Sequence, residues 1–88
     1  MPEIRVVIGS SVGLHARPAS QFVKAATATS SDVRIGRPDS DLVDARSMLS
    51  VLSLAIGHGE EVVLRADGDG ADAALTELSR MLESDLDA

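Results

Sequence analysis

The sequence contains no cysteine, tryptophan or tyrosine, and its single aromatic residue is Phe22. The lack of cysteine excludes disulfides, thiolate nucleophiles and thiolate metal sites, and it is typical of proteins of the reducing cytoplasm. The interior therefore has to be filled by Val, Leu, Ile, Met and Ala, which with Phe22 make up the 44% of hydrophobic residues. A core of this size suits one small domain, so we expect residues 1–88 to fold as a single unit.

The chain also lacks long apolar runs. Its apolar segments are far shorter than the roughly 20 residues that cross a bilayer. The first five residues contain no basic stretch followed by an apolar one, which is the pattern of a secretory signal. We therefore expect a cytoplasmic protein without membrane insertion.

Positive charge is scarce, with 8 Lys and Arg against 14 Asp and Glu and a formal net charge of −6. This balance repels nucleic-acid phosphates, and a module that reads RNA would need basic residues and stacking aromatic rings. We therefore expect no nucleic-acid binding. The acidic balance instead favours solubility, or attraction to a basic surface on a protein partner.

The hydrophobic pattern predicts seven elements in the order strand, helix, strand, strand, helix, strand, helix. The strands are expected at residues 4–8, 33–35, 42–43 and 61–66, and the helices at residues 16–28, from 48 until Gly57 ends the helix, and 74–82. Each strand has only one clearly apolar face, so an antiparallel sheet with helices on one side is the simplest packing. The predicted fold class is α+β.

One segment, Gly13–Ala19 with the sequence GLHARPA, lies where the first predicted strand leads into the first predicted helix. Gly13 allows an unusual backbone angle, and Pro18 favours the first turn of a helix. The helix start formed by Ala16, Arg17 and Pro18 has N–H groups without partners and carries partial positive charge. We therefore expect this turn to bind an anion such as phosphate.

His15 stands in the middle of that segment. Histidine is largely neutral near pH 7, and a neutral imidazole is a nucleophile that can take up a phosphoryl group. Arg17 adds a forked donor that fits phosphate oxygens. The sequence therefore makes His15 the candidate phosphoryl acceptor and Arg17 its candidate catalytic partner, while His58 is assigned no function.

The heptapeptide Gly13–Ala19 is similar to the phosphohistidine signature of the HPr family of phosphocarriers. The resemblance extends over the whole chain in its length, in the distance of the signature from the N-terminus and in the order of elements. It implies an open-faced β-sandwich of order βαββαβα, with a four-stranded antiparallel sheet and three helices on one face. It also implies that enzyme I phosphorylates His15 with phosphoenolpyruvate as the source, and that enzyme IIA domains receive the phosphoryl group for sugar uptake and phosphorylation.

Such a carrier is transiently phosphorylated and is not a stand-alone enzyme. We expect a monomer without a cofactor and without a metal site, since two distant histidines show no ligand spacing.

A second segment, Arg46–Leu54, is similar to the regulatory-serine segment of the same family. Ser47 is expected to cap the second helix at its N-terminus. By the resemblance, it also stands at the position that a dedicated serine kinase phosphorylates in some bacteria. Transcriptional regulators are further expected partners. The apolar residues that follow are the expected docking face for partner proteins: Met48, Leu49, Val51 and Leu52.

Three residues depart from the family pattern. Val12 stands where many members have a polar residue, so a side-chain hydrogen bond from that position to the phosphate is lost. Ser50 and Ala55 stand where many members have glycine, which affects how closely partners approach the short helix. None of the three alters His15 or Arg17, so we expect an effect on partner choice rather than on phosphoryl transfer.

Two other functions remain open at this point. One is a paralogous carrier that serves a nitrogen-related or regulatory phosphorelay, with the same chemistry and different partners. The other is a small-ligand-binding regulatory module on a similar α/β scaffold.

Overall fold

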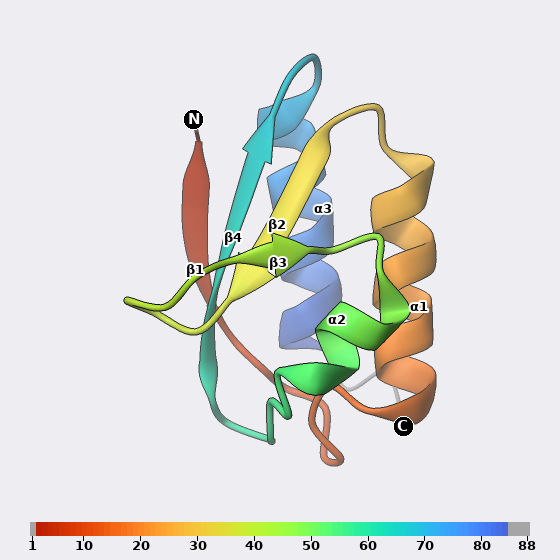
Figure 1. The fold of residues 1–88 in the computed structure, drawn as a ribbon, viewed down its shortest axis with the longest axis vertical. Helices are drawn as coiled ribbons and strands as arrows, with labels where there is room; N and C mark the ends of the chain where they lie inside the picture. Colours follow the sequence, from red (N-terminus) through yellow and green to blue (C-terminus); the bar gives the residue numbers. More distant parts are fainter. Residues whose placement is uncertain (1, 85–88) are drawn as a thin grey trace.

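Four antiparallel strands form an open sheet, and two long helices pack side by side on one of its faces (Figure 1). The computed structural model describes residues 2–84. Its elements are β1 (Glu3–Val7), α1 (Ala16–Ala28), β2 (Asp32–Gly36), β3 (Val43–Asp44), α2 (Met48–Ser53), β4 (Glu61–Asp67) and α3 (Ala71–Glu83). The predicted order of elements and the predicted α+β open-faced class are confirmed.

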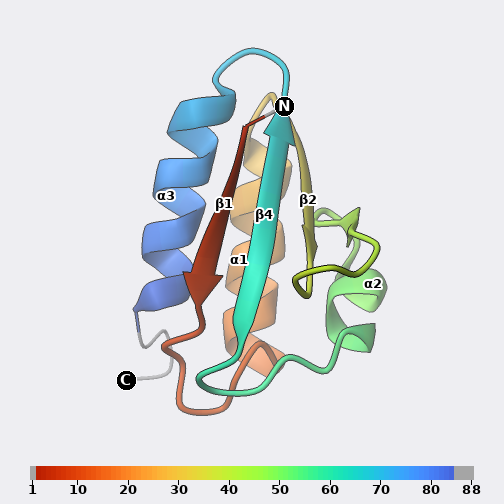
Figure 2. The ribbon, with the colours of Figure 1, turned by 90° about the vertical axis from the view of Figure 1, so that its left-hand side faces the viewer.

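The strands lie in the order β1-β4-β2-β3. Alternate residues of the central strands point to the covered face, including Val33 and Ile35 of β2 and Leu64 of β4, and these side chains are fully buried. Figure 2 looks onto the uncovered face, with α1 and α3 behind the strands. There the strands carry charged residues that pair across the sheet, such as Arg65 with Glu3 at 3.0 Å. This alternation is what an antiparallel sheet with one solvated face requires.

The core between the sheet and the helices is aliphatic, as the composition predicts. Phe22 of α1 is its largest fully buried side chain, and Leu78 of α3 packs into the same cluster. The short helix α2 packs against α1 and beside β3, and it contributes the fully buried Val51. Within residues 2–84, no helix has the length and apolar character of a membrane span.

Some predicted boundaries are wrong by a few residues. The second helix does not extend to Gly57: α2 ends at Ser53, because Ala55 takes a left-handed conformation with φ of 54° and turns the chain away. The first strand ends at Val7 rather than Ile8, whose N–H donates to Glu60 O in a neighbouring loop instead.

Candidate functional site

His15 is the N-cap residue of α1, with an extended backbone at φ −126° and ψ 160°. Its side chain is exposed and makes no capping hydrogen bond to the helix. The first turn of α1 contains no acidic residue that would compete for its N–H groups. The imidazole therefore stands at the positive end of a 13-residue helix and is not tied to it.

The predicted anion-binding turn contains two backbone donors. Ala16 and Arg17 are the first two residues of α1, and their N–H groups have no acceptor within the helix. Pro18 has no N–H and is fully buried, so its part in the site is to set the start of the helix. The Arg17 side chain is exposed beside this turn.

The loop before His15 is packed tightly enough to explain its glycines. Gly13 has φ of 72°, and a Cβ there would lie 2.5 Å from the Ile56 carbonyl oxygen and 2.8 Å from Gly57 Cα. Leu14 is buried, and its N–H donates to the Ile56 carbonyl at 2.9 Å. At the other end of the loop, the Gly9 N–H donates to the Leu82 carbonyl of α3 at 2.9 Å. The backbone that leads to His15 is thus held at both ends.

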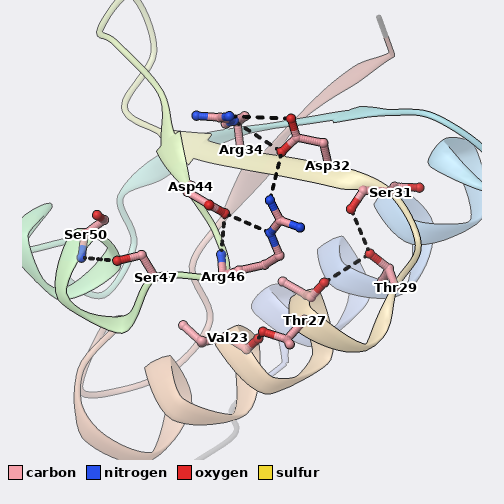
Figure 3. A network of polar contacts seen from close by, with 11 residues as sticks. Val23, Thr27, Thr29, Ser31, Asp32, Arg34, Asp44, Arg46, Ser47 and Ser50 are labelled. Atoms are coloured by element: carbon pink, nitrogen blue, oxygen red, sulfur yellow. Dashed lines mark hydrogen bonds and ion pairs between the residues drawn. The ribbon is translucent and has the colours of Figure 1, made fainter.

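The second predicted segment starts α2, close to α1. The Ser47 hydroxyl accepts a hydrogen bond from the Ser50 N–H at 3.3 Å, so the predicted N-cap is confirmed (Figure 3). The preceding Arg46 is held by Asp44, whose carboxylate accepts from the Arg46 N–H at 2.9 Å and from its Nε at 3.2 Å. The backbone hydrogen bond, followed by the guanidinium, holds the pKa of Asp44 below its ordinary value.

The predicted docking residues do not share one surface. Leu49 is 82% exposed, whereas Met48 and Leu52 are half-buried and pack against the core. Val51 is fully buried and belongs to the core, so the prediction that it contacts a partner is wrong. Val12 is 46% exposed in the loop before His15. Around His15 and α2, the apolar surface available to a partner therefore includes Leu49, the outer parts of Met48 and Leu52, and Val12.

Three residues of this region carry no signal in the sequence. The His58 Nδ1 lies 3.0 Å from the Ser10 carbonyl oxygen, and the acceptor character of that oxygen means that Nδ1 bears the proton. Arg37 pairs with Glu60 at 3.1 Å, and both contact the chain that follows α2. These pairs are separated by 48 and 23 residues in the sequence, so local patterns do not reveal them.

A hollow on the uncovered face of the sheet does not include His15. Asp32 and Arg34 lie opposite Asp67 and Arg65 on neighbouring strands there, and all four line the hollow. Arg34 is bound to Asp32 at 3.3 Å, so these charges are compensated within the sheet. Ligand pockets are usually enclosed and largely apolar. This surface offers the small-ligand hypothesis little support.

An open sheet with an exposed histidine at the N-cap of its first helix is the arrangement that the resemblance to small phosphocarrier proteins predicts. The comparisons agree: residues 2–84 match the family model described as "PTS HPr component phosphorylation site". The phosphocarrier protein HPr of Streptomyces coelicolor is 51% identical over 99% of this chain and 94% of its own. That of Haloferax volcanii is 49% identical over 93% of each chain.

Solved structures show the same relationship. The crystal structure of a phosphocarrier protein HPr from Bacillus anthracis superimposes with a TM-score of 0.88 at 34% identity, over 92% of this chain and 95% of the other. The chain belongs to the HPr family, and it is a phosphotransfer carrier of the phosphotransferase system.

Proposed function

We propose that His15 accepts a phosphoryl group from enzyme I, which is charged by phosphoenolpyruvate, and passes it to enzyme IIA domains for sugar uptake and phosphorylation. The observation that carries this proposal is the exposed imidazole at the N-cap of α1, which makes no hydrogen bond to the helix. In the first transfer a ring nitrogen of His15 attacks phosphorus, a nitrogen–phosphorus bond forms, and the bond between phosphorus and the donor group breaks. In the onward transfer a nucleophile of the acceptor attacks the same phosphorus, a bond between phosphorus and the acceptor forms, and the nitrogen–phosphorus bond to His15 breaks.

The surroundings of His15 support both halves of the reaction. The N–H groups of Ala16 and Arg17 face the position next to the N-cap, where the oxygens of a phosphoryl group would accept from them. The exposed Arg17 guanidinium supplies a forked, charge-assisted donor. Because these donors are in place before the reaction, they stabilise charge without rearrangement of the site.

Partner contacts follow from the same end of the molecule. The start of α1 and the helix α2 lie together at one end of the fold (Figure 1). We propose that Met48, Leu49 and Leu52 form the docking surface, and that a serine kinase acts on Ser47 to regulate it, with transcriptional regulators binding the same region. The carrier is proposed to act as a monomer in the cytoplasm.

The direct test is incubation of the wild-type protein and of His15→Ala with phosphoenolpyruvate and enzyme I. We expect the wild-type protein to gain one acid-labile phosphoryl group, which peptide mapping assigns to His15. We expect His15→Ala to gain none. Its free energy of unfolding should lie within about 0.5 kcal/mol of the wild-type value, because an exposed side chain without a capping hydrogen bond contributes little stability. Residual incorporation in His15→Ala would contradict the assignment. Parallel assays with carbohydrate-branch and nitrogen-branch enzyme I separate the two carrier functions.

A further inference from the structure

The loop before His15 lies against the loop that follows α2 at the lower end of the molecule (Figure 2). Ile8 makes two backbone hydrogen bonds with the second loop, both at 3.0 Å. The Ile8 N–H donates to the Glu60 carbonyl, and the Ile8 carbonyl accepts from the Gly59 N–H. Leu14, the residue before His15, donates to the Ile56 carbonyl at 2.9 Å. The position of residues 54–60 therefore determines where the backbone at His15 can lie.

Residues 54–60 are in turn fixed by one arginine from the turn after β2. The Arg37 guanidinium donates to the Leu54 carbonyl, and at 3.2 Å to the Ala55 carbonyl. These carbonyls follow the end of α2, where the helix supplies no N–H partner. The same guanidinium binds Glu60 at 3.1 and 3.2 Å, and the Glu60 Oε2 accepts the Gly57 N–H at 2.5 Å. We call this set of contacts the Arg37–Glu60 clasp.

The clasp is more than a surface ion pair. Isolated exposed pairs stabilise proteins little, and Arg37 and Glu60 are 39% and 41% exposed. Here, however, the fork of one guanidinium joins two carbonyls and a carboxylate, and that carboxylate also holds a backbone N–H. The Gly57 N–H, followed by the Arg37 guanidinium, holds the pKa of Glu60 below its ordinary value.

We propose that Arg37 and Glu60 are positioning residues for phosphoryl transfer. They keep the backbone of His15 in place by fixing residues 54–60 against the loop that precedes His15. The inference rests on the proposed function of His15. It also connects the end of α2, next to the docking surface, to the backbone at the reactive histidine. Reactions that require alignment of two groups lose rate when one of them is displaced or mobile.

The chain supplies a matched control. Arg5 and Glu61 form an exposed ion pair at 3.2 Å across β1 and β4, with exposures of 57% and 44%. This pair resembles Arg37 with Glu60 in its charges and in the distance between the charged atoms. Its guanidinium, however, contacts no carbonyl of residues 54–60 among the described contacts. A loss that depends only on general charge or stability would appear in both pairs.

The experiment compares Arg37→Met, Glu60→Ala, Glu60→Gln and Arg5→Met with the wild type. Three quantities are measured: thermal unfolding, hydrogen exchange of the Leu14 amide, and kcat and KM for phosphorylation by enzyme I. We expect Arg37→Met and Glu60→Ala to remain folded, to exchange the Leu14 amide about tenfold faster, and to lose about five- to tenfold in kcat with KM within about twofold. Glu60→Gln keeps an acceptor for the Gly57 N–H and should recover part of this loss. Arg5→Met should match the wild type.

Three results would overturn the proposal: unchanged kcat in a folded Arg37→Met protein, unchanged exchange of the Leu14 amide, or an equal loss in Arg5→Met. A failure of the proposed function looks different, because the wild-type protein itself would then gain no phosphoryl group. The exchange of Leu14 in Arg37→Met still tests the clasp in that case, since it does not depend on transfer.

Discussion

Arg17 follows His15 by two positions, in the first turn of α1, and its side chain is exposed. Removal of this forked donor leaves the backbone N–H groups of the turn in place, so transfer should be slowed rather than abolished. A charge-assisted hydrogen bond contributes about 1.5 to 3 kcal/mol, so we expect Arg17→Ala to reduce kcat/KM by roughly one to two decades.

Lys24 provides the control for Arg17, because it is an exposed cation on the same helix, two turns further along. Lys24→Ala should transfer at the wild-type rate. An equal loss in both variants would indicate that net charge, rather than a donor at the site, determines the rate.

At the scale of elements, the end of α2 carries local strain. Ala55 has φ of 54°, in the left-handed region where a side chain costs roughly 1 to 2 kcal/mol. Glycine avoids this cost but loses more entropy on folding, so Ala55→Gly should raise stability by up to about 1 kcal/mol. For a domain of this size that corresponds to an increase in Tm of roughly 4–8 °C.

Thermal unfolding measures this effect, with Ala73→Gly in α3 as the control. Ala73 is exposed within a regular helix, where glycine costs up to about 1 kcal/mol, so this variant should lose stability. A lower Tm in Ala55→Gly would show that the left-handed conformation carries no strain.

The start of α2 separates a structural role from a binding role. The Ser47 hydroxyl caps the helix through the Ser50 N–H, and aspartate is an equally good N-cap. Ser47→Asp should therefore keep the unfolding temperature. The added charge lies beside Leu49, which a partner has to cover, so we expect the apparent KM for phosphorylation by enzyme I to rise about tenfold, or roughly 1.4 kcal/mol.

Ser47→Ala should have the opposite pattern of effects on stability and on transfer. It removes the cap without adding charge, so it should lose about 1 kcal/mol of stability and transfer normally. Unchanged kinetics in Ser47→Asp would mean that the surface beside Ser47 does not meet enzyme I.

At the scale of the whole molecule, two carboxylates make the fold sensitive to acid. Hydrogen bonds from the backbone N–H groups of Arg46 and Gly57, followed by the guanidinium groups of Arg46 and Arg37, hold the pKa values of Asp44 and Glu60 below their ordinary values of 3.8 and 4.5. A carboxylate with a lowered pKa stabilises the fold fully above its ordinary pKa and loses this contribution as pH falls through the folded value.

We therefore expect the free energy of unfolding to decrease as the pH falls below about 4.5. Urea unfolding between pH 7 and pH 3 measures the decrease. It should be smaller in the double variant Asp44→Asn, Glu60→Gln, which starts from a lower stability at pH 7. An equally steep decrease in that variant would show that other carboxylates carry the acid sensitivity.

The sequence by itself determined what depends on neighbouring residues. The prediction of α1 at residues 16–28 rests on Pro18 and on the helical spacing of apolar residues, which both lie within the helix itself. The Ser47 cap and the α+β order were predicted for the same reason. The candidate residues His15 and Arg17 came from one contiguous segment, and the structure places both at the exposed start of α1.

The tertiary structure decided what depends on residues far apart in the chain. Whether Val51 faces the core or a partner depends on how α2 packs against α1 and β3, and a helical pattern that is apolar over a broad face does not fix that choice. The contacts of Arg37 with Glu60 and of His58 with Ser10 join segments 23 and 48 residues apart. Such contacts arise only when packing of the apolar faces brings the loops together, and their polar side chains carry no periodic signal of their own.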